Sequence, residues 1–291
     1  MITDDELDEL ERAVELALRS GDASGLSLLG EGEISLVLAA GSEPGWACKR
    51  LPPFATAEAA DRYTSTIGRY IDELERRGVD VVHTEVRRVD GTDGTVVLYC
   101  VQPVMPKTDL AVDIARDEPD RAPALIADVI DTVFTTIDAR IGLDAQLSNW
   151  AVVDGRLTYF DITTPLMRGA DGVSELDADV FLASLPWALR APVRRFVLPG
   201  ILERYHDPRT VSLDLASNLI KEHLDDLVPA VLDSTAGRVA TPLSEEEVRA
   251  DRRSDARLWA TLQAVRRADR AWQRHVRRRP YPFLLPGHAN S

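Results

Sequence analysis

The sequence has few of the residues typical of disulfide-bonded, metal-binding or triad-containing proteins. It has two cysteines in 291 residues, Cys48 and Cys100, and each stands in an apolar run typical of a β-strand. Cysteines in that setting favour reduced core residues over a disulfide framework. The five histidines show no spacing typical of metal ligands. No combination of serine, histidine and aspartate can be proposed from spacing either.

Long apolar runs are also missing. No stretch approaches the roughly 18 apolar residues that predict a transmembrane helix. The first residues, 1–6, lack the basic and apolar segments of a signal peptide. These absences predict a cytoplasmic protein with no membrane span.

Lysine is scarce and the charge is uneven. The net charge of −14 argues against nucleic acid as a partner, although residues 251–279 carry ten arginines against three aspartates. Three lysines stand against thirty-one arginines, a bias typical of a GC-rich genome. A lysine in a special position, such as Lys49, is therefore a candidate functional residue.

Residues 3–20 predict an amphipathic helix. Thr3 and Glu6 form a capping box, and apolar residues follow at helical spacing. We expect this helix to pack on the domain behind it, with no catalytic role.

Residues 26–51 predict a strand, a glycine-rich turn and two further strands, with Lys49 in the third. The turn contains Gly30 and Gly32. Glycines let backbone N–H groups approach phosphate oxygens, and an ammonium group nearby can neutralise a triphosphate. Because Gly-x-Gly is also common in ordinary hairpins, this turn alone leaves both interpretations open.

The next segment completes a sheet. Residues 56–77 predict a helix, and 79–89 and 95–103 predict two more strands. Together with the first three strands they predict a five-stranded sheet with one inserted helix. Prolines at 103 and 106 indicate a stiff connector and a boundary near residue 104.

Residues 141–165 contain the strongest hairpin signal in the chain. Asp154-Gly155 separates two apolar runs, and the register that it predicts places Asn149 opposite Phe160. Asn149 would then lie near Asp161, with Asp144 one short loop upstream. These side chains are either turn residues of a surface hairpin or oxygen ligands for a hard cation.

The order of these features along residues 26–165 resembles that of the protein-kinase-like superfamily. Within that superfamily the sequence most resembles the aminoglycoside- and choline-phosphotransferase-like branch, and the resemblance implies a divergent bacterial member. The resemblance implies a two-lobed α+β fold. The N-lobe, 1–103, would hold a five-stranded antiparallel sheet with one helix, and the C-lobe, 104–291, would be mainly helical.

The resemblance also implies ATP and Mg²⁺ as cofactors. Asp144 would accept or orient the proton of an acceptor hydroxyl, and Asn149 and Asp161 would coordinate Mg²⁺. Lys49 would contact the α- and β-phosphates. Further nucleotide contacts would come from Gly30 and Gly32 at the phosphates and from the backbone around Gln102 and Val104 at the adenine.

The catalytic loop departs from the family pattern. Gly142-Leu143 precedes Asp144 where a histidine is usual, and Gln146 replaces a cationic residue. The loss of that charge weakens stabilisation of the transferring phosphoryl group unless another cation, such as Arg168, replaces it. The resemblance further implies that the helix 56–77 supplies an acidic partner for Lys49. Three residues are candidates for that partner: Glu58, Asp61 and Glu73.

The remaining chain predicts helices over 109–116, 121–140, 176–204 and 211–232, with Trp187 and Phe196 in the core. Residues 244–279 predict a long basic helix. This helix would either bind an acidic partner or a membrane surface, or pack across the acidic remainder of the chain; we favour intramolecular packing.

These features together predict an ATP–Mg²⁺-dependent phosphotransferase that acts on an unidentified acceptor hydroxyl. A small molecule is favoured over a protein because no Ala-Pro-Glu segment follows Asp161. The alternative is a catalytically inactive kinase-like protein that binds nucleotide or acts as a scaffold.

Overall fold

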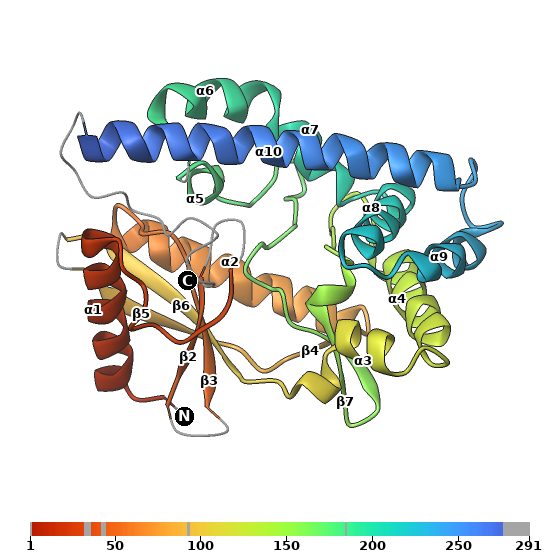
Figure 1. The fold of residues 1–291 in the computed structure, drawn as a ribbon, viewed down its shortest axis with the longest axis horizontal. Helices are drawn as coiled ribbons and strands as arrows, with labels where there is room; N and C mark the ends of the chain where they lie inside the picture. Colours follow the sequence, from red (N-terminus) through yellow and green to blue (C-terminus); the bar gives the residue numbers. More distant parts are fainter. Residues whose placement is uncertain (1, 32–35, 42–44, 92–93, 184, 276–291) are drawn as a thin grey trace.

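The computed structural model describes residues 2–275 apart from 32–35, 42–44, 92–93 and 184. It confirms the α+β class, with a five-stranded antiparallel sheet and a mainly helical remainder (Figure 1). The strand order is β1-β2-β3-β6-β5. These strands are β1 (Leu28–Glu31), β2 (Leu36–Ala40), β3 (Trp46–Arg50), β5 (Glu85–Asp90) and β6 (Val96–Pro103).

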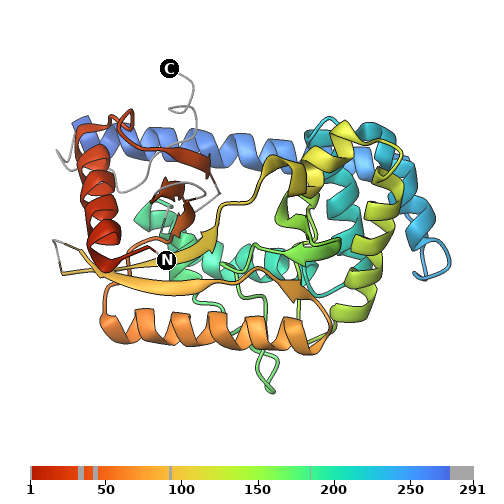
Figure 2. The ribbon, with the colours of Figure 1, turned by 90° about the horizontal axis from the view of Figure 1, so that it is seen from below.

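Two helices cover opposite faces of this sheet (Figure 2). Helix α1 (Asp4–Ser20) begins with the expected capping box of Thr3 and Glu6, and α2 (Ala57–Arg76) is capped by Thr56. Because successive strand residues point to opposite faces, neighbouring residues of β3 meet different helices. Arg50 points toward α1, whereas Lys49 lies on the face that α2 covers.

The segment 79–89 is not the single strand that we expected. Residues Asp80–Val81 form β4, which pairs in parallel with β8 of a second sheet, and β5 begins only at Glu85. The Val82 N–H donates to the Tyr159 carbonyl, which fixes this departure from the first sheet. Both pieces alternate apolar and polar residues, so their pattern alone could not separate them.

The second sheet contains the expected hairpin. Its strands β7 (Trp150–Val153) and β8 (Arg156–Tyr159) pair Val153 with Arg156, as predicted. Asp154 and Gly155 have φ values of 50° and 76°, so both central turn positions are left-handed.

Short helices make up most of the remainder. They are η1 (Lys107–Asp109), α3 (Ala111–Asp117), α4 (Ala122–Thr136), η2 (Leu147–Asn149), α5 (Ala178–Leu182), α6 (Trp187–Phe196), α7 (Leu198–Arg204), α8 (Pro208–Lys221), η3 (Asp225–Leu227) and α9 (Val228–Thr235). One hydrophobic core joins α2 and β6 to α3, α4, α8 and α9.

Two of the expected helices are shorter than their apolar periodicity suggested. Helix α4 ends at Thr136, because the Asp138 side chain accepts hydrogen bonds from the backbone of Arg140 and Ile141 and turns the chain. The expected helix 211–232 is divided after Lys221, where His223 adopts a left-handed φ of 60°.

Trp187 and Phe196 were expected in the core, and this expectation was wrong. They are 74% and 81% exposed. Nine positions separate them along α6, which places them on opposite sides of a helix. A single packing face therefore cannot bury both.

Helix α10 (Glu245–His275) runs along the length of the molecule (Figure 1). It packs against α8, with Val248 fully buried. The pairing is the reverse of the one expected for a basic helix, because acidic residues of α10 pair with arginines of the body: Glu247 with Arg209 and Asp251 with Arg204.

Residues 276–279, the end of the expected basic helix, lie outside the described part. Of the helices that the structure describes, none is both long and apolar enough to cross a membrane.

Candidate active site

The centre of the candidate site is an ion pair between two residues far apart in sequence. Lys49 Nζ of β3 lies 2.5 Å from Asp161 Oδ1, across 112 residues of chain. The hydroxyl of Thr163 donates to the same oxygen at 2.8 Å. The Lys49 and Asp161 side chains are 19% and 21% exposed, so the pair is screened from water but remains reachable.

Asp161 is held in its ionised form. Burial alone would raise the pKa of its carboxyl, but the charge of Lys49 and the hydrogen bonds from Lys49 and Thr163 outweigh burial and lower that pKa. The side-chain hydrogen bonds from Lys49 and Thr163 both go to Oδ1. Asp161 can therefore offer a charged oxygen to a cation.

The hairpin brings Asn149 to this site. The Phe160 N–H donates to the Asn149 carbonyl at 3.1 Å, which places Asn149 beside the residue that precedes Asp161. The Asn149 side-chain amide donates to the Asp144 carbonyl at 3.2 Å. This bond fixes the orientation of the amide, so its oxygen is available as a ligand.

Asp144 lies in the loop that leads into the hairpin. One of its carboxylate oxygens accepts a hydrogen bond from the Gln146 backbone N–H at 3.2 Å. The side chain is half-buried. The expected trio of Asp144, Asn149 and Asp161 is therefore gathered around the open end of the hairpin.

Gly142 explains part of the unusual loop sequence before Asp144. A Cβ on this residue would lie 2.7 Å from the Tyr205 carbonyl oxygen, so a larger residue does not fit. The Gly142 N–H donates to the Leu166 carbonyl, and its own carbonyl accepts from the Tyr70 hydroxyl of α2 at 2.9 Å. These contacts fix the base of the loop.

Helix α2 does not supply the acidic partner for Lys49 in the described part of the chain. The three candidates are either exposed or paired with arginine: Glu58, Asp61 and Glu73. The helix contacts the site instead through Tyr63, whose hydroxyl donates to the Thr163 carbonyl at 2.9 Å. In the sequence, a tyrosine on an apolar helix face is interpreted as a core residue, so this contact could not be predicted.

Three of the four residues expected to contact the nucleotide besides Lys49 are described by the structure: Gly30, Gln102 and Val104. Gly30 lies in β1 opposite Val37, whereas Gly32 lies outside the described residues. The Gln102 side chain bridges the Thr84 hydroxyl and the Phe160 carbonyl, both at 2.9 Å. The Val104 N–H donates to the Gly45 carbonyl at 3.3 Å.

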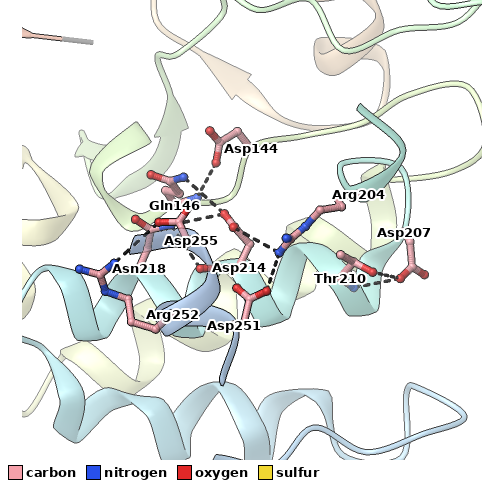
Figure 3. Close-up of polar contacts among 10 residues, drawn as sticks. All are labelled: Asp144, Gln146, Arg204, Asp207, Thr210, Asp214, Asn218, Asp251, Arg252 and Asp255. Carbon is pink, nitrogen blue, oxygen red and sulfur yellow. Dashed lines mark hydrogen bonds and ion pairs between the residues drawn. The ribbon is translucent and has the colours of Figure 1, made fainter. Parts of the chain in front are cut away.

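Gln146 stands where the family pattern has a cationic residue, and Arg168 was the candidate to replace that charge. The Gln146 side chain donates to Asp214 of α8 at 3.3 Å, as Figure 3 shows. Arg168 pairs with Glu203 of α7 at 2.6 Å. Asp214 could not be predicted from the sequence, because only the tertiary fold brings α8 to the loop.

The donor set suits a hard cation that keeps part of its water shell. In the described part of the chain, no group of three or more His, Cys, Asp or Glu side chains is arranged to bind a metal ion. Asn149 and Asp161 supply one amide and one carboxylate oxygen. Mg²⁺ commonly takes one or two protein ligands and completes its octahedron with water and phosphate, so this pair fits that ion.

A family model matches residues 9–270 and describes a family of unknown function, DUF6206. The chain belongs to this family. No curated protein sequence matches this chain.

Two solved structures illustrate its likeness to known proteins. "WaaP in complex with acyl carrier protein" is 16% identical, with 74% of this chain and 93% of that chain covered, and has a TM-score of 0.35. MAP kinase LmaMPK10 from Leishmania major is 11% identical, with 82% and 86% covered, and has a TM-score of 0.33. At these TM-scores neither likeness carries an argument about activity.

Proposed function

We propose that this DUF6206 protein is a kinase-like phosphotransferase that uses ATP and Mg²⁺ and acts on an acceptor hydroxyl. The observation that carries this proposal is the Lys49–Asp161 pair, with Asn149 at the same end of the hairpin. One cation and two oxygen donors from separate parts of the chain meet at a half-buried site. That set of groups suits a metal–triphosphate, whose negative charge the cation neutralises.

Each residue has a distinct task in this proposal. Lys49 binds phosphate oxygens, and the oxygens of Asn149 and Asp161 bind Mg²⁺, which neutralises charge on the phosphates. Asp144 accepts or orients the proton of the acceptor hydroxyl. A small-molecule acceptor is favoured over a protein, since the chain after Asp161 lacks the Ala-Pro-Glu segment of protein kinases.

One observation favours a second candidate, a kinase-like protein that binds nucleotide without turnover. Gln146 stands where a cation would stabilise the transferring group, and its side-chain amide is engaged by Asp214. The loss of such a charge lowers the rate of phosphoryl transfer while leaving nucleotide binding intact.

Calorimetric titration with Mg²⁺–ATP and an assay for ADP release separate these candidates. We expect the wild type to bind Mg²⁺–ATP and release ADP, and Lys49→Ala and Asp161→Asn to lose most binding. Asp144→Asn should bind normally but turn over about 10²–10⁴ times more slowly, because general-base catalysis contributes on that order. Lys221→Ala is the matched control, since Lys221 is an exposed lysine at the end of α8.

Three outcomes are informative. Binding with turnover that falls in Asp144→Asn supports the phosphotransferase. Binding with turnover no higher than in Asp144→Asn would overturn the enzyme in favour of the non-catalytic protein. Binding unchanged in both Lys49→Ala and Asp161→Asn would contradict the proposed site itself.

A further inference from the structure

The catalytic loop is connected to the C-terminal helix by a chain of polar contacts (Figure 3). The Gln146 amide donates to Asp214 Oδ2 of α8 at 3.3 Å, and Arg204 Nη2 of α7 lies 3.7 Å from Asp214 Oδ1. The same Arg204 nitrogen lies 2.9 Å from Asp251 Oδ1 of α10. Four separate segments of the chain thus meet beside Asp144.

The charge balance of this group does not favour stability. Three carboxylates, those of Asp214, Asp251 and Asp255, lie beside two guanidiniums: Arg204 pairs with Asp214 and Asp251, and Arg252 pairs with Asp255 at 3.7 Å. The charges of Asp251 and Asp255 both raise the pKa of Asp214. One oxygen of Asp251 is buried without a hydrogen-bond partner among the described residues. Like charges held close together weaken a fold, so stability alone does not account for their placement.

Asp214 has one role that the geometry makes clear. Its carboxylate accepts hydrogen bonds from the Asn218 and Gln146 side-chain amides, both at 3.3 Å. Asn218 lies on the same helix as Asp214. Gln146 lies two residues after Asp144, and its backbone N–H donates to the Asp144 carboxylate. The position of Asp214 therefore constrains the residue that orients Asp144.

We propose that Asp214, held by Arg204 and Asp251, is a positioning residue through which the first half of α10 sets the geometry of the loop that carries Asp144. Its effect on turnover rests on the phosphotransferase proposed above, but the positioning itself does not. Helix α10 is then a structural part of the site, because its Asp251 fixes the arginine that holds Asp214.

The titration of Asp214 reports on this connection without any assay of activity. Burial raises the pKa of Asp214; Arg204 and the Gln146 hydrogen bond oppose that shift, whereas Asp251 and Asp255 reinforce it. Removal of the Arg204 charge should therefore raise this pKa further. The Gln146 side-chain amide, bonded directly to Asp214, should show the same titration in its NMR shift.

The experiment follows the Gln146 side-chain amide by NMR over pH, together with hydrogen exchange of its backbone amide, in the full-length protein. Arg204→Met should raise the pH midpoint of the amide and speed backbone exchange about threefold or more, because local opening becomes easier. Arg204→Lys should restore part of both. Asp214→Asn, which keeps an acceptor for Gln146, should preserve slow exchange but abolish the titration, whereas Asp214→Ala should lose both.

Arg209→Met is the matched control. Arg209 pairs with Glu247 at 2.7 Å and so also joins the body of the protein to α10. Among the described residues, the ion pair to Asp214 comes from Arg204 and none comes from Arg209. It should leave the Gln146 midpoint and exchange unchanged. Equal effects of Arg204→Met and Arg209→Met, or no effect of either, would overturn the proposal.

A separate assay measures the effect on turnover. Arg204→Met should lower kcat with little change in the KM for Mg²⁺–ATP, whereas Arg209→Met should change neither. If the wild type shows no turnover, the phosphotransferase fails while the NMR result still decides the positioning. An unchanged kcat with a shifted Gln146 amide would overturn only the catalytic consequence.

Discussion

Neighbouring residues of β3 form two ion pairs on opposite faces of the sheet. Arg50 and Glu11 of α1 make a bidentate pair with distances of 2.6 and 2.7 Å, and the Tyr99 hydroxyl donates to the same carboxylate at 2.6 Å. The Arg50 and Glu11 side chains are 7% and 4% exposed. Lys49 and Asp161 form one contact and are 19% and 21% exposed.

The difference between the two pairs follows from how completely each is satisfied. The Glu11 carboxylate accepts three hydrogen bonds, so it has little capacity for a further partner. The two side-chain hydrogen bonds to Asp161 both go to Oδ1, and Lys49 is a flexible, monodentate cation. The first pair holds α1 on the sheet, whereas the second leaves groups available to a ligand.

The largest loss of stability should come from breaking the Arg50–Glu11 pair. Glu11→Ala leaves Arg50 buried without its partner, and such a loss typically costs about 3–5 kcal/mol. We expect a fall of that size in the free energy of unfolding, measured by urea denaturation. Arg19→Ala removes a pair with Glu15 on the same helix in which the arginine is 60% exposed, and it should change stability by less than about 1 kcal/mol. Similar values for the two variants would contradict the contrast between the faces.

A smaller loss should follow from crowding the loop on the other face. Gly142→Ala places a Cβ 2.7 Å from the Tyr205 carbonyl, a backbone atom that cannot move alone. Overpacking of this kind costs about 1–3 kcal/mol, again measured by urea denaturation. Gly68→Ala, in α2 with nothing within 4 Å of its Cβ, should be neutral or stabilising. A neutral Gly142→Ala would show that the loop is not held as described.

The Lys49–Asp161 pair should contribute less to the free energy of unfolding, and its contribution should depend on pH. The pKa of Asp161 is lowered from its ordinary value of 3.8, so its ionisation favours the fold above that value, and this stability is lost as the pH falls through the lowered pKa. Lys49→Ala should cost about 1 kcal/mol at neutral pH after allowance for its partial exposure. The difference from wild type, followed by denaturation from pH 7 to 3, should shrink toward the acid end. A constant difference would mean that Lys49 acts by packing alone.

The smallest effect concerns thiol chemistry on the two faces. Burial raises the pKa of Cys48, on the α1 face, to about 11 and that of Cys100, beside Lys49, to about 12. Neither should react with a thiol reagent at pH 8 in the folded protein, as followed by mass spectrometry. Glu11→Ala should expose Cys48 before Cys100, because only Cys48 lies under α1. Simultaneous reaction in that variant would indicate global unfolding in place of loss of α1.

The sequence determined the features that depend on local chemistry. The capping box at Thr3, the Asp154-Gly155 hairpin and its register, and the antiparallel strands around Lys49 were all predicted correctly. Each depends on residues within a few positions, where turn conformation and side-chain alternation act directly. The hairpin register was sufficient to place Asn149 beside the segment that carries Asp161.

Only the tertiary structure decided which partners these residues have. Arg50 meets Glu11 across 39 residues, Gln146 meets Asp214 across 68, and Lys49 meets Asp161 across 112. The sequence left three acids of α2 as equal candidates for Lys49, and it joined β4 to β5. No local pattern can separate such alternatives, because the contacts form only when distant elements pack together and fix which side chains share a buried space.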